Sequence, residues 1–184
     1  VVDKTGTLTV GKPELESIIP ANGTDEKTLL RFAASLERGS EHPLAAAIVK
    51  GAEDRGLKLS GAEAFESLTG RGVRGQVGGS PVALGNQKLL EELRVDPGPL
   101  AAKAEALRAD GQTVMFVVVE HKLVGLLGVA DPIKETTPEA IRRLKDAGVE
   151  AISLSLDGST AERHDAFRGV SGTLTILLAA LAGL

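Results

Sequence analysis

The stretch DKTGTLT, residues 3–9, brings together a carboxylate, an amine, three threonine hydroxyls and a glycine. Asp3 follows the apolar pair Val1-Val2, so we expect it at the carboxyl end of a buried strand, where open α/β sheets bind ligands. Gly6 permits the positive φ angle that a tight polar loop needs. A lone Asp-Lys pair beside a turn is more often a solvated surface feature, but the complete seven-residue string favours a functional loop.

The same string resembles, without a substitution, the phosphorylation motif of the P-type ATPases. The resemblance implies that Asp3 attacks the γ-phosphate of ATP and forms an aspartyl phosphate, while Mg²⁺ neutralises charge on the phosphoryl oxygens. It also implies that Asp3 and the backbone carbonyl of Thr5 hold the metal ion, and that backbone groups of Thr5 and Gly6 face the phosphate. By the same resemblance, Lys4 and Thr7 belong to the catalytic loop.

Composition limits the partners of this 184-residue chain. The net charge of −4 comes from interspersed acidic and basic residues, so no nucleic-acid-binding surface is expected. The absence of cysteine excludes disulfides, thiolate metal sites and cysteine nucleophiles. The apolar run TLTILLAALAGL is too short to span a bilayer, so we expect a soluble chain. The resemblance implies that it lies on the cytoplasmic side of its parent protein.

Hydrophobic spacing predicts an alternation of helices and strands. Helices are expected over 24–38, 43–56, 86–94, 98–110 and 136–147. Strands are expected over 1–2, 63–68, 72–77, 80–85, 112–119, 123–130 and 150–156. The glycine-punctuated runs between 63 and 85 predict an antiparallel meander. The nearly continuous apolar run 123–130 indicates a strand buried on both faces.

This order predicts an α/β fold of two units, a parallel sheet with an inserted α+β lobe, and the resemblance implies that the sheet is haloacid-dehalogenase-like. We expect the parallel sheet, or phosphorylation domain, to comprise residues 1–12 and 123–184. The inserted nucleotide-binding domain would comprise residues 13–122. Asp131-Pro132 matches the family's hinge before the next helix, although Asp-Pro is also a common strand terminator.

Three short stretches of the inserted lobe extend the resemblance to the heavy-metal-transporting branch of the P-type ATPases. They are the Ser-Glu-His-Pro of LERGSEHPLAAAI, the Gly-x-Gly of TGRGVRG and the Gly-Asn of VALGNQKLL. Carried over residue by residue, the family's ATP site falls on Glu37, His42, Gly70, Gly72, Gly85 and Asn86.

The chemistry of these residues suits a nucleotide. Gly70 and Gly72 let the backbone approach a phosphate or ribose, and Glu37 and His42 can hydrogen-bond a purine edge. Each fragment has a simpler interpretation, since His42 could merely begin a helix and a Gly-Asn pair could be an ordinary turn. Their joint order after DKTGTLT favours the nucleotide site.

Residues 150–184 depart from the resemblance. The family continues with a strand ending in Thr-Gly-Asp, then a catalytic lysine and a distant acidic pair. Here Ser155 stands in place of the threonine as a hydrogen-bond donor, Leu156 replaces the glycine, and Lys145 is the last lysine. The segment SLDG…HDAFRG instead resembles part of the radical S-adenosylmethionine enzymes, whose iron–sulfur cluster needs cysteines that this chain lacks.

Three functions follow from these residues. The first is the ATP-binding and phosphorylation portion of a heavy-metal P-type ATPase, whose metal ion would pass through membrane helices outside this chain. The second is a stand-alone phosphohydrolase, which is disfavoured because Thr5 occupies the position of its general-acid aspartate. The third is a non-catalytic nucleotide-binding remnant or chimera, which the missing lysine and acidic pair favour for the chain as it stands.

We expect residues 1–184 alone to bind ATP without measurable hydrolysis. Phosphoryl transfer needs dense positive charge around the γ-phosphate, and the loss of one such element commonly costs about a hundredfold in rate. Only Asp131 and Asp157 remain as candidates to hold Mg²⁺ opposite Asp3. Incubation with [γ-³²P]ATP should leave no acid-stable label on Asp3, whereas stoichiometric labelling that disappears in Asp3→Asn would contradict this expectation.

Overall fold

The computed structural model describes residues 8–146, and the expected strands 1–2 and 150–156 lie outside this range. The helices of the described part are α1 (Glu26–Glu37), α2 (Pro43–Glu53), α3 (Gln87–Leu93), α4 (Leu100–Ala109) and α5 (Thr137–Asp146). Its strands are β1 (Glu14–Pro20), β2 (Ala62–Leu68), β3 (Gly72–Val77), β4 (Ser80–Gly85), β5 (Thr113–Val119) and β6 (Lys122–Ala130).

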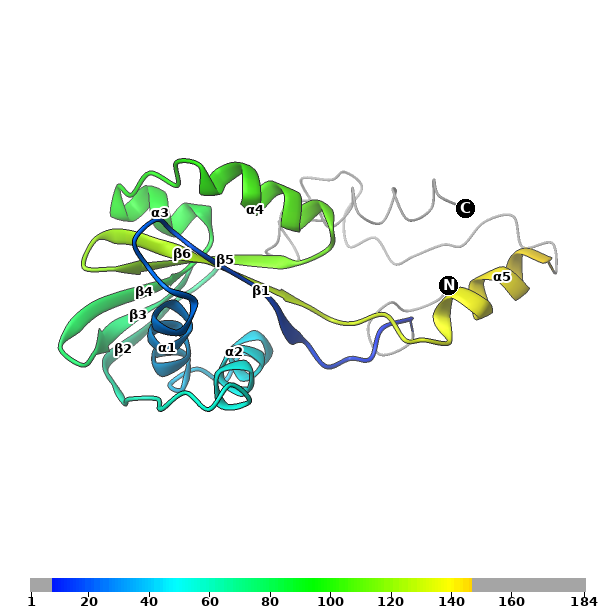
Figure 1. The fold of residues 1–184 in the computed structure, drawn as a ribbon, viewed down its shortest axis with the longest axis horizontal. Coiled ribbons are helices and arrows are strands. Elements are labelled where there is room, and N and C mark those ends of the chain that lie inside the picture. Colours follow the sequence, from blue (N-terminus) through cyan, green and yellow to red (C-terminus); the bar gives the residue numbers. More distant parts are fainter. Residues whose placement is uncertain (1–7, 147–184) are drawn as a thin grey trace. The chain divides into compact units, whose positions relative to one another are not determined.

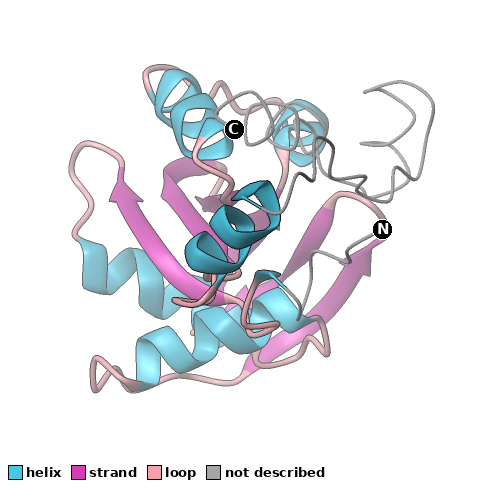
Figure 2. Ribbon diagram, turned by 90° about the vertical axis from the view of Figure 1, so that its right-hand side faces the viewer, coloured by secondary structure: helices cyan, strands magenta, loops and turns pink. Residues whose placement is uncertain are grey.

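The strands form one six-stranded sheet in the order β1-β6-β5-β4-β3-β2, and every neighbouring pair is antiparallel. Figure 1 shows α1 and α2 on one face of this sheet, with α3 and α4 on the other. The side view in Figure 2 shows the same layers. The expected meander over 63–85 is confirmed, because β2, β3 and β4 pair in sequence.

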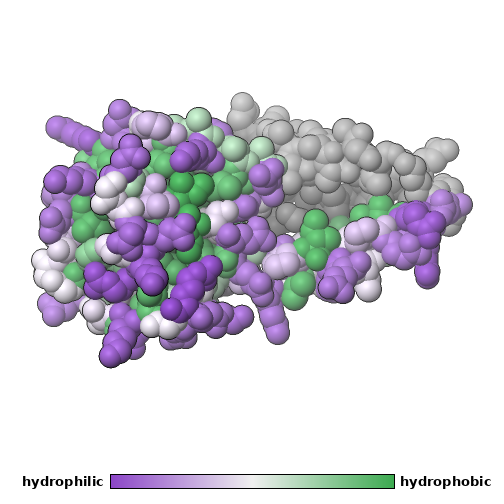
Figure 3. Space-filling model, in the orientation of Figure 1, coloured by the Kyte–Doolittle hydropathy of each residue, from purple (hydrophilic) through white to green (hydrophobic). Residues whose placement is uncertain are grey.

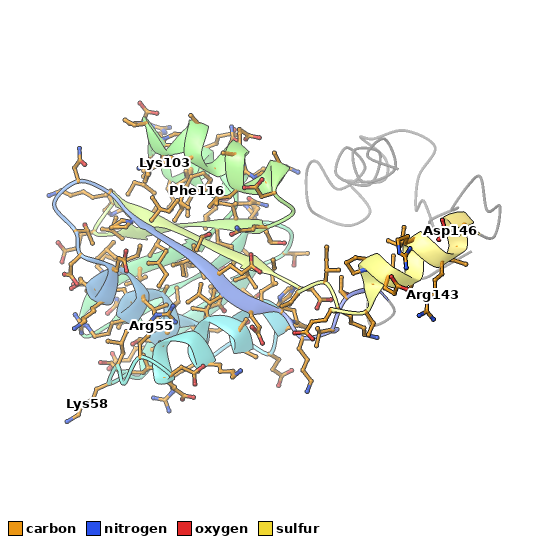
Figure 4. All side chains as sticks on the ribbon, turned by 45° about the vertical axis from the view of Figure 1, so that its right-hand side comes forward. Arg55, Lys58, Lys103, Phe116, Arg143 and Asp146 are labelled. Carbon is orange, nitrogen blue, oxygen red and sulfur yellow. The ribbon has the colours of Figure 1, made fainter. Side chains whose placement is uncertain are left out.

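Alternation along β5 joins the sheet to both helical layers. Met115, Val117 and Val119 belong to the core that contains the buried residues of α1 and α2. Val114, Phe116 and Val118 belong to the core that contains those of α3 and α4. Figure 4 shows Phe116 beneath α4, while Lys103 of that helix points outward. A strand covered on both sides must be apolar at every position, and this accounts for the run VMFVVV.

The placement of the 123–130 strand in the parallel sheet was wrong. This segment is β6, and it pairs antiparallel with β1 on one side and β5 on the other. Burial on both faces was correctly predicted, since residues 125–129 are all buried. That burial comes from helices packed on both faces of an antiparallel sheet, so an apolar run does not by itself indicate parallel pairing.

The edge strand β1 was not predicted. Its sequence ELESIIP does not alternate cleanly, because the register with β6 shifts between Leu15 and Ser17. A bulge inserts an extra residue into one strand, so the regular alternation of apolar and polar side chains is interrupted there. A sequence pattern that looks for this alternation therefore misses the strand. Pro20 is tolerated because it ends a strand at the margin of the sheet.

The chain divides into two compact units. One unit, here called the sheet unit, comprises residues 14–108 and 112–130, and the other comprises 1–13, 109–111 and 131–184. The sheet unit buries its large apolar side chains, and polar groups, coloured purple, cover much of its visible face in Figure 3. Among the described residues, the exposed large apolar side chains are Val10, Ile133 and Leu144, all in the second unit.

A strained turn joins β5 to β6. Val119 pairs with Lys122, so Glu120 and His121 form a two-residue loop, and both have positive φ angles of 50° and 62°. This geometry matches the strand twist but normally takes Asn-Gly, since other L-residues are strained there. The Ser80 hydroxyl donates to Glu120 Oε1 over 2.8 Å and ties the turn to β4.

Replacing His121 by glycine should therefore stabilise the protein. The substitution removes the strain at φ 62° and leaves the Ser80–Glu120 hydrogen bond in place. We expect a gain of about 0.5–1 kcal/mol in the free energy of unfolding, measured by urea denaturation. His121→Ala is the matched control and should gain little, because alanine keeps the strain. Equal effects of the two substitutions would contradict this interpretation of the turn.

Candidate functional site

The candidate site residues of the sheet unit lie in two clusters. The first is the loop between α1 and α2, residues 37–42, here called the carboxylate loop. Glu37 ends α1 and is only 5% exposed, and its Oε2 atom has no hydrogen-bond partner among the described residues. Burial raises the pKa of Glu37 to about 7, and a hydrogen bond with the Ser40 side chain opposes the shift. A buried carboxylate with an unused acceptor is costly unless something pairs with it.

Backbone bonds hold the carboxylate loop in a tight turn. The amide of Gly39 donates to Leu36 O over 3.2 Å, and that of Ser40 donates to Glu37 O over 2.9 Å. The His42 amide donates to Ser40 Oγ over 3.3 Å. The two bonds to Leu36 O and Glu37 O satisfy carbonyls of the last turn of α1, which have no partner within the helix.

His42 caps the first turn of α2. Its Nδ1 atom accepts a 3.2 Å hydrogen bond from the Leu44 amide, and Pro43 occupies the first helical position. Because Nδ1 is an acceptor, the neutral ring carries its proton on Nε2. His42 can therefore both cap α2 and bind a ligand. The cap uses Nδ1, and Nε2–H remains as a hydrogen-bond donor.

Two glycines allow the carboxylate loop to lie close to the sheet. A Cβ atom on Gly39 would lie 3.0 Å from the Phe65 ring of β2. A Cβ atom on Gly75 of β3 would lie 3.0 Å from Leu36 Cδ1 and 3.0 Å from the Glu63 carbonyl oxygen. The end of α1 is thus seated directly on β2 and β3, and this fixes the position of Glu37.

The second cluster, here called the glycine corner, comprises residues 70–72 with Gly85 and Asn86. Gly72 and Gly85 face each other across β3 and β4. A Cβ on Gly72, whose φ is +146°, would lie 2.1 Å from Leu84 O, and a Cβ on Gly85 would lie 2.2 Å from Arg71 O. Neither site has room for a side chain, so a substitution such as Gly72→Val tests folding rather than a ligand contact.

Asn86 locks the glycine corner to α3. Its Oδ1 atom accepts from the Leu89 amide over 3.3 Å, and its Nδ2 atom donates to Gly70 O over 2.8 Å. Its own amide donates to Arg71 O over 2.9 Å. Asn86 therefore positions the loop through three bonds. Gly70, with φ +69° and no atom within 4 Å of an added Cβ, leaves an open side on the corner.

The structure brings Gly70, Gly72, Gly85 and Asn86 together, and it places Glu37 and His42 in the other cluster. Both clusters rest on β3, at Gly72 and at Gly75 respectively. The expected catalytic residues Asp3, Lys4, Thr5, Thr7 and Ser155 lie outside the described residues.

Asp131, expected as a hinge residue and a candidate metal ligand, accepts three hydrogen bonds within the second unit. Its Oδ2 atom accepts from Thr9 Oγ1 over 2.5 Å, and its Oδ1 atom accepts from the amides of Gly11 and Lys12 over 2.8 and 3.1 Å. Asp131 thus ties Thr9 and the backbone of Gly11 and Lys12 to the end of β6. Sequence reasoning missed Thr9 as its partner, although Thr9 is the last residue of DKTGTLT.

The described range contains neither a metal-binding group of side chains nor a membrane-spanning helix. Between residues 8 and 146, no three or more His, Asp or Glu side chains are grouped so that they could hold a metal ion. No helix in that part of the chain is both long and apolar enough to cross a membrane.

Comparison with known proteins gives a consistent result. A family model for haloacid dehalogenase-like hydrolases matches residues 1–174. A copper-transporting P-type ATPase of Rhizobium leguminosarum bv. viciae is 53% identical over 163 residues, which cover 89% of this chain and 19% of that protein. A copper-exporting P-type ATPase of Legionella pneumophila is 49% identical over 177 residues, covering 96% of this chain and 23% of that protein. The chain thus spans about a fifth of the length of these curated relatives.

A solved structure supports the same grouping. The crystal structure of a zinc-transporting PIB-type ATPase in the E2.Pi state matches with a TM-score of 0.73 and 34% identity, covering 92% of this chain and 28% of that chain. The expected haloacid-dehalogenase-like fold class is confirmed by the family match. The resemblance of residues 150–184 to radical S-adenosylmethionine enzymes gains no support, because the family match continues to residue 174.

The raised pKa of Glu37 makes a testable contribution to stability. The folded protein keeps this proton up to pH of about 7, whereas the unfolded chain releases it near 4.5, so stability falls as the pH rises between these values. Glu37→Gln removes the penalty and should gain stability relative to the wild type as the pH rises from 4.5 to 8, by up to about 3 kcal/mol. Urea denaturation at pH 4.5 and pH 8 measures this difference.

The exposed neighbour provides the control for this experiment. Glu41→Gln removes one carboxylate from an exposed position of the same loop, and it should not reproduce the gain in stability that Glu37→Gln shows at pH 8. A Glu37→Gln effect that is equal at both pH values would show that the Glu37 carboxylate ionises as freely in the folded protein as in the unfolded chain.

Proposed function

The chain belongs to the haloacid dehalogenase-like hydrolase family, and from that premise we propose that it is the ATP-binding and phosphorylation portion of a heavy-metal-transporting P-type ATPase. The P-type ATPase relatives and the zinc-transporting structure support this assignment. The transported ion would be a heavy-metal cation, carried by parts of the pump outside these residues. The portion would work on the cytoplasmic side, where ATP is available.

The observation that carries the proposal is the buried Glu37 carboxylate, whose Oε2 atom has no hydrogen-bond partner within residues 8–146. An amino group of a nucleobase is a donor that such an acceptor can bind in a water-poor environment. The adenine ring would thus be recognised at the carboxylate loop, with its amino group donating to Glu37 and the Nε2–H of His42 donating to a ring nitrogen. Recognition of the base through its edge does not require an aromatic stacking partner.

The glycine corner would take the ribose and phosphate part of the nucleotide. Gly70 leaves its backbone accessible, and Gly72 and Gly85 allow β3, β4 and the loop to pack without side chains between them. Asn86 would keep the loop in place through its bonds to Gly70 and Arg71 rather than by touching the ligand. On this view its role in the site is to position the loop.

We propose that the sheet unit is the nucleotide-binding domain, with boundaries at 13/14 and 130/131 instead of 12/13 and 122/123. The remaining residues would form the phosphorylation domain. In the intact parent protein, the Asp3 carboxylate would form a bond to the γ-phosphorus of ATP while the bond to the bridging oxygen breaks, so that ADP leaves with the electron pair. Mg²⁺ held by Asp3 and the Thr5 carbonyl would supply positive charge, and Lys4 and Thr7 would complete the loop.

Substitutions in the carboxylate loop test the nucleotide site. At pH 8, Glu37→Gln should weaken ATP binding roughly tenfold or more, and His42→Ala roughly five- to tenfold, because each loses one ligand hydrogen bond. The difference between the wild type and Glu37→Gln should shrink as the pH falls through about 7, where the wild-type carboxylate gains its proton. Isothermal titration calorimetry with ATP measures both effects.

Glu41→Gln serves again as the control and should bind ATP like the wild type. The wild-type protein failing to bind ATP, or Glu37→Gln binding it as tightly as the wild type at pH 8, would contradict the proposed site.

A further inference from the structure

Arg71 is the only charged residue of the glycine corner. It lies between Gly70 and Gly72, and its backbone is fixed at both ends. Its amide donates to Leu68 O over 2.9 Å, and its carbonyl accepts from the Asn86 amide over 2.9 Å. The side chain therefore starts from a fixed point beside the open side of the corner at Gly70.

The Arg71 guanidinium pairs with the carboxylate of Glu92 on α3. The two side chains are 42% and 38% exposed, so water and salt screen the pair. Exposed pairs of this kind contribute little to stability, and a stronger anion can displace the carboxylate at small cost. A guanidinium presents a rigid fork of donors that matches phosphate oxygens, and a polyphosphate carries several charges where Glu92 carries one.

We infer that Arg71 binds the phosphate chain of the nucleotide and that Glu92 holds this side chain in place while no nucleotide is bound. The inference rests on the proposed ATP site and adds to it the group that recognises the phosphates. With the base at the carboxylate loop, the phosphate chain would extend to the glycine corner. On binding, the guanidinium would exchange a carboxylate partner for a phosphate partner.

A second ion pair nearby provides a comparison. Arg74 of β3 lies three residues after Arg71, which belongs to the turn before that strand, and it pairs with Glu66 of β2, with Nε to Oε2 at 2.8 Å and side chains 46% and 52% exposed. The two pairs match in type and in exposure. Arg71 differs in lying between the two glycines of the corner, next to its open side. If general surface charge attracted ATP, both arginines would contribute alike.

Calorimetric titrations with ATP and with adenosine separate phosphate recognition from base recognition. Arg71→Ala should weaken ATP binding about fivefold and leave adenosine binding unchanged. Glu92→Gln should strengthen ATP binding about twofold, because the competing carboxylate is gone, and should also leave adenosine unchanged. Arg71→Lys should lie between the wild type and Arg71→Ala, and Arg74→Ala should change neither ligand.

The outcomes distinguish this inference from the function on which it rests. Wild-type protein that binds no ATP would overturn both. Wild-type binding of ATP with Arg71→Ala equal to Arg74→Ala would overturn the inference alone and leave the ATP site standing. An equal loss of ATP and adenosine affinity in Arg71→Ala would also overturn it, since that result would mean that Arg71 shapes the corner rather than binds phosphate.

Discussion

Burial of the sheet on both faces is the constraint on which the rest of the sheet unit depends. Helices α1 and α2 cover one face and α3 and α4 the other, so β5 and β6 have apolar side chains at nearly every position. Polar chemistry is thereby confined to the places where elements end. Glu37 ends α1, His42 and Asn86 precede helices, and Gly72 begins β3. The candidate nucleotide site is built from helix caps and strand ends because the interior of the sheet cannot hold it.

The same layout explains why the site lowers the stability of the protein. Helix α1 packs Leu36 against Gly75 and thereby buries Glu37. The Oε2 atom of its carboxylate has no hydrogen-bond partner in the part of the chain that the structure describes. A residue chosen for stability alone would be neutral there. Sites that bind ligands commonly retain such unfavourable groups, because the ligand supplies the missing partner. The strained φ angles of the β5–β6 turn are not part of the candidate site. That turn is held to β4 by the hydrogen bond from the Ser80 hydroxyl to Glu120.

How far the sequence predicts the structure depends on whether the signal is local. The starts of α2 and α3 and the β2–β4 meander were predicted, since each is set by neighbouring residues. The antiparallel pairing of β6 was not predicted, because an apolar run indicates that a strand is buried but does not indicate the direction of its neighbours. The strand β1 was hidden by its bulge, and the bond between Asp131 and Thr9 joins residues 122 positions apart. Glu37 was found by its motif, but its burial could be seen only in the folded chain.

The most direct test of the central claim is the titration of the Glu37 carboxyl carbon by ¹³C NMR, with and without ATP. The free protein should show a midpoint near pH 7, as burial requires. A bound adenine amino group favours the ionised carboxylate, so saturating ATP should move the midpoint of this carbon to lower pH. A midpoint that stays unchanged while ATP is bound would show that Glu37 does not contact the nucleotide, and the proposed site would have to be placed elsewhere.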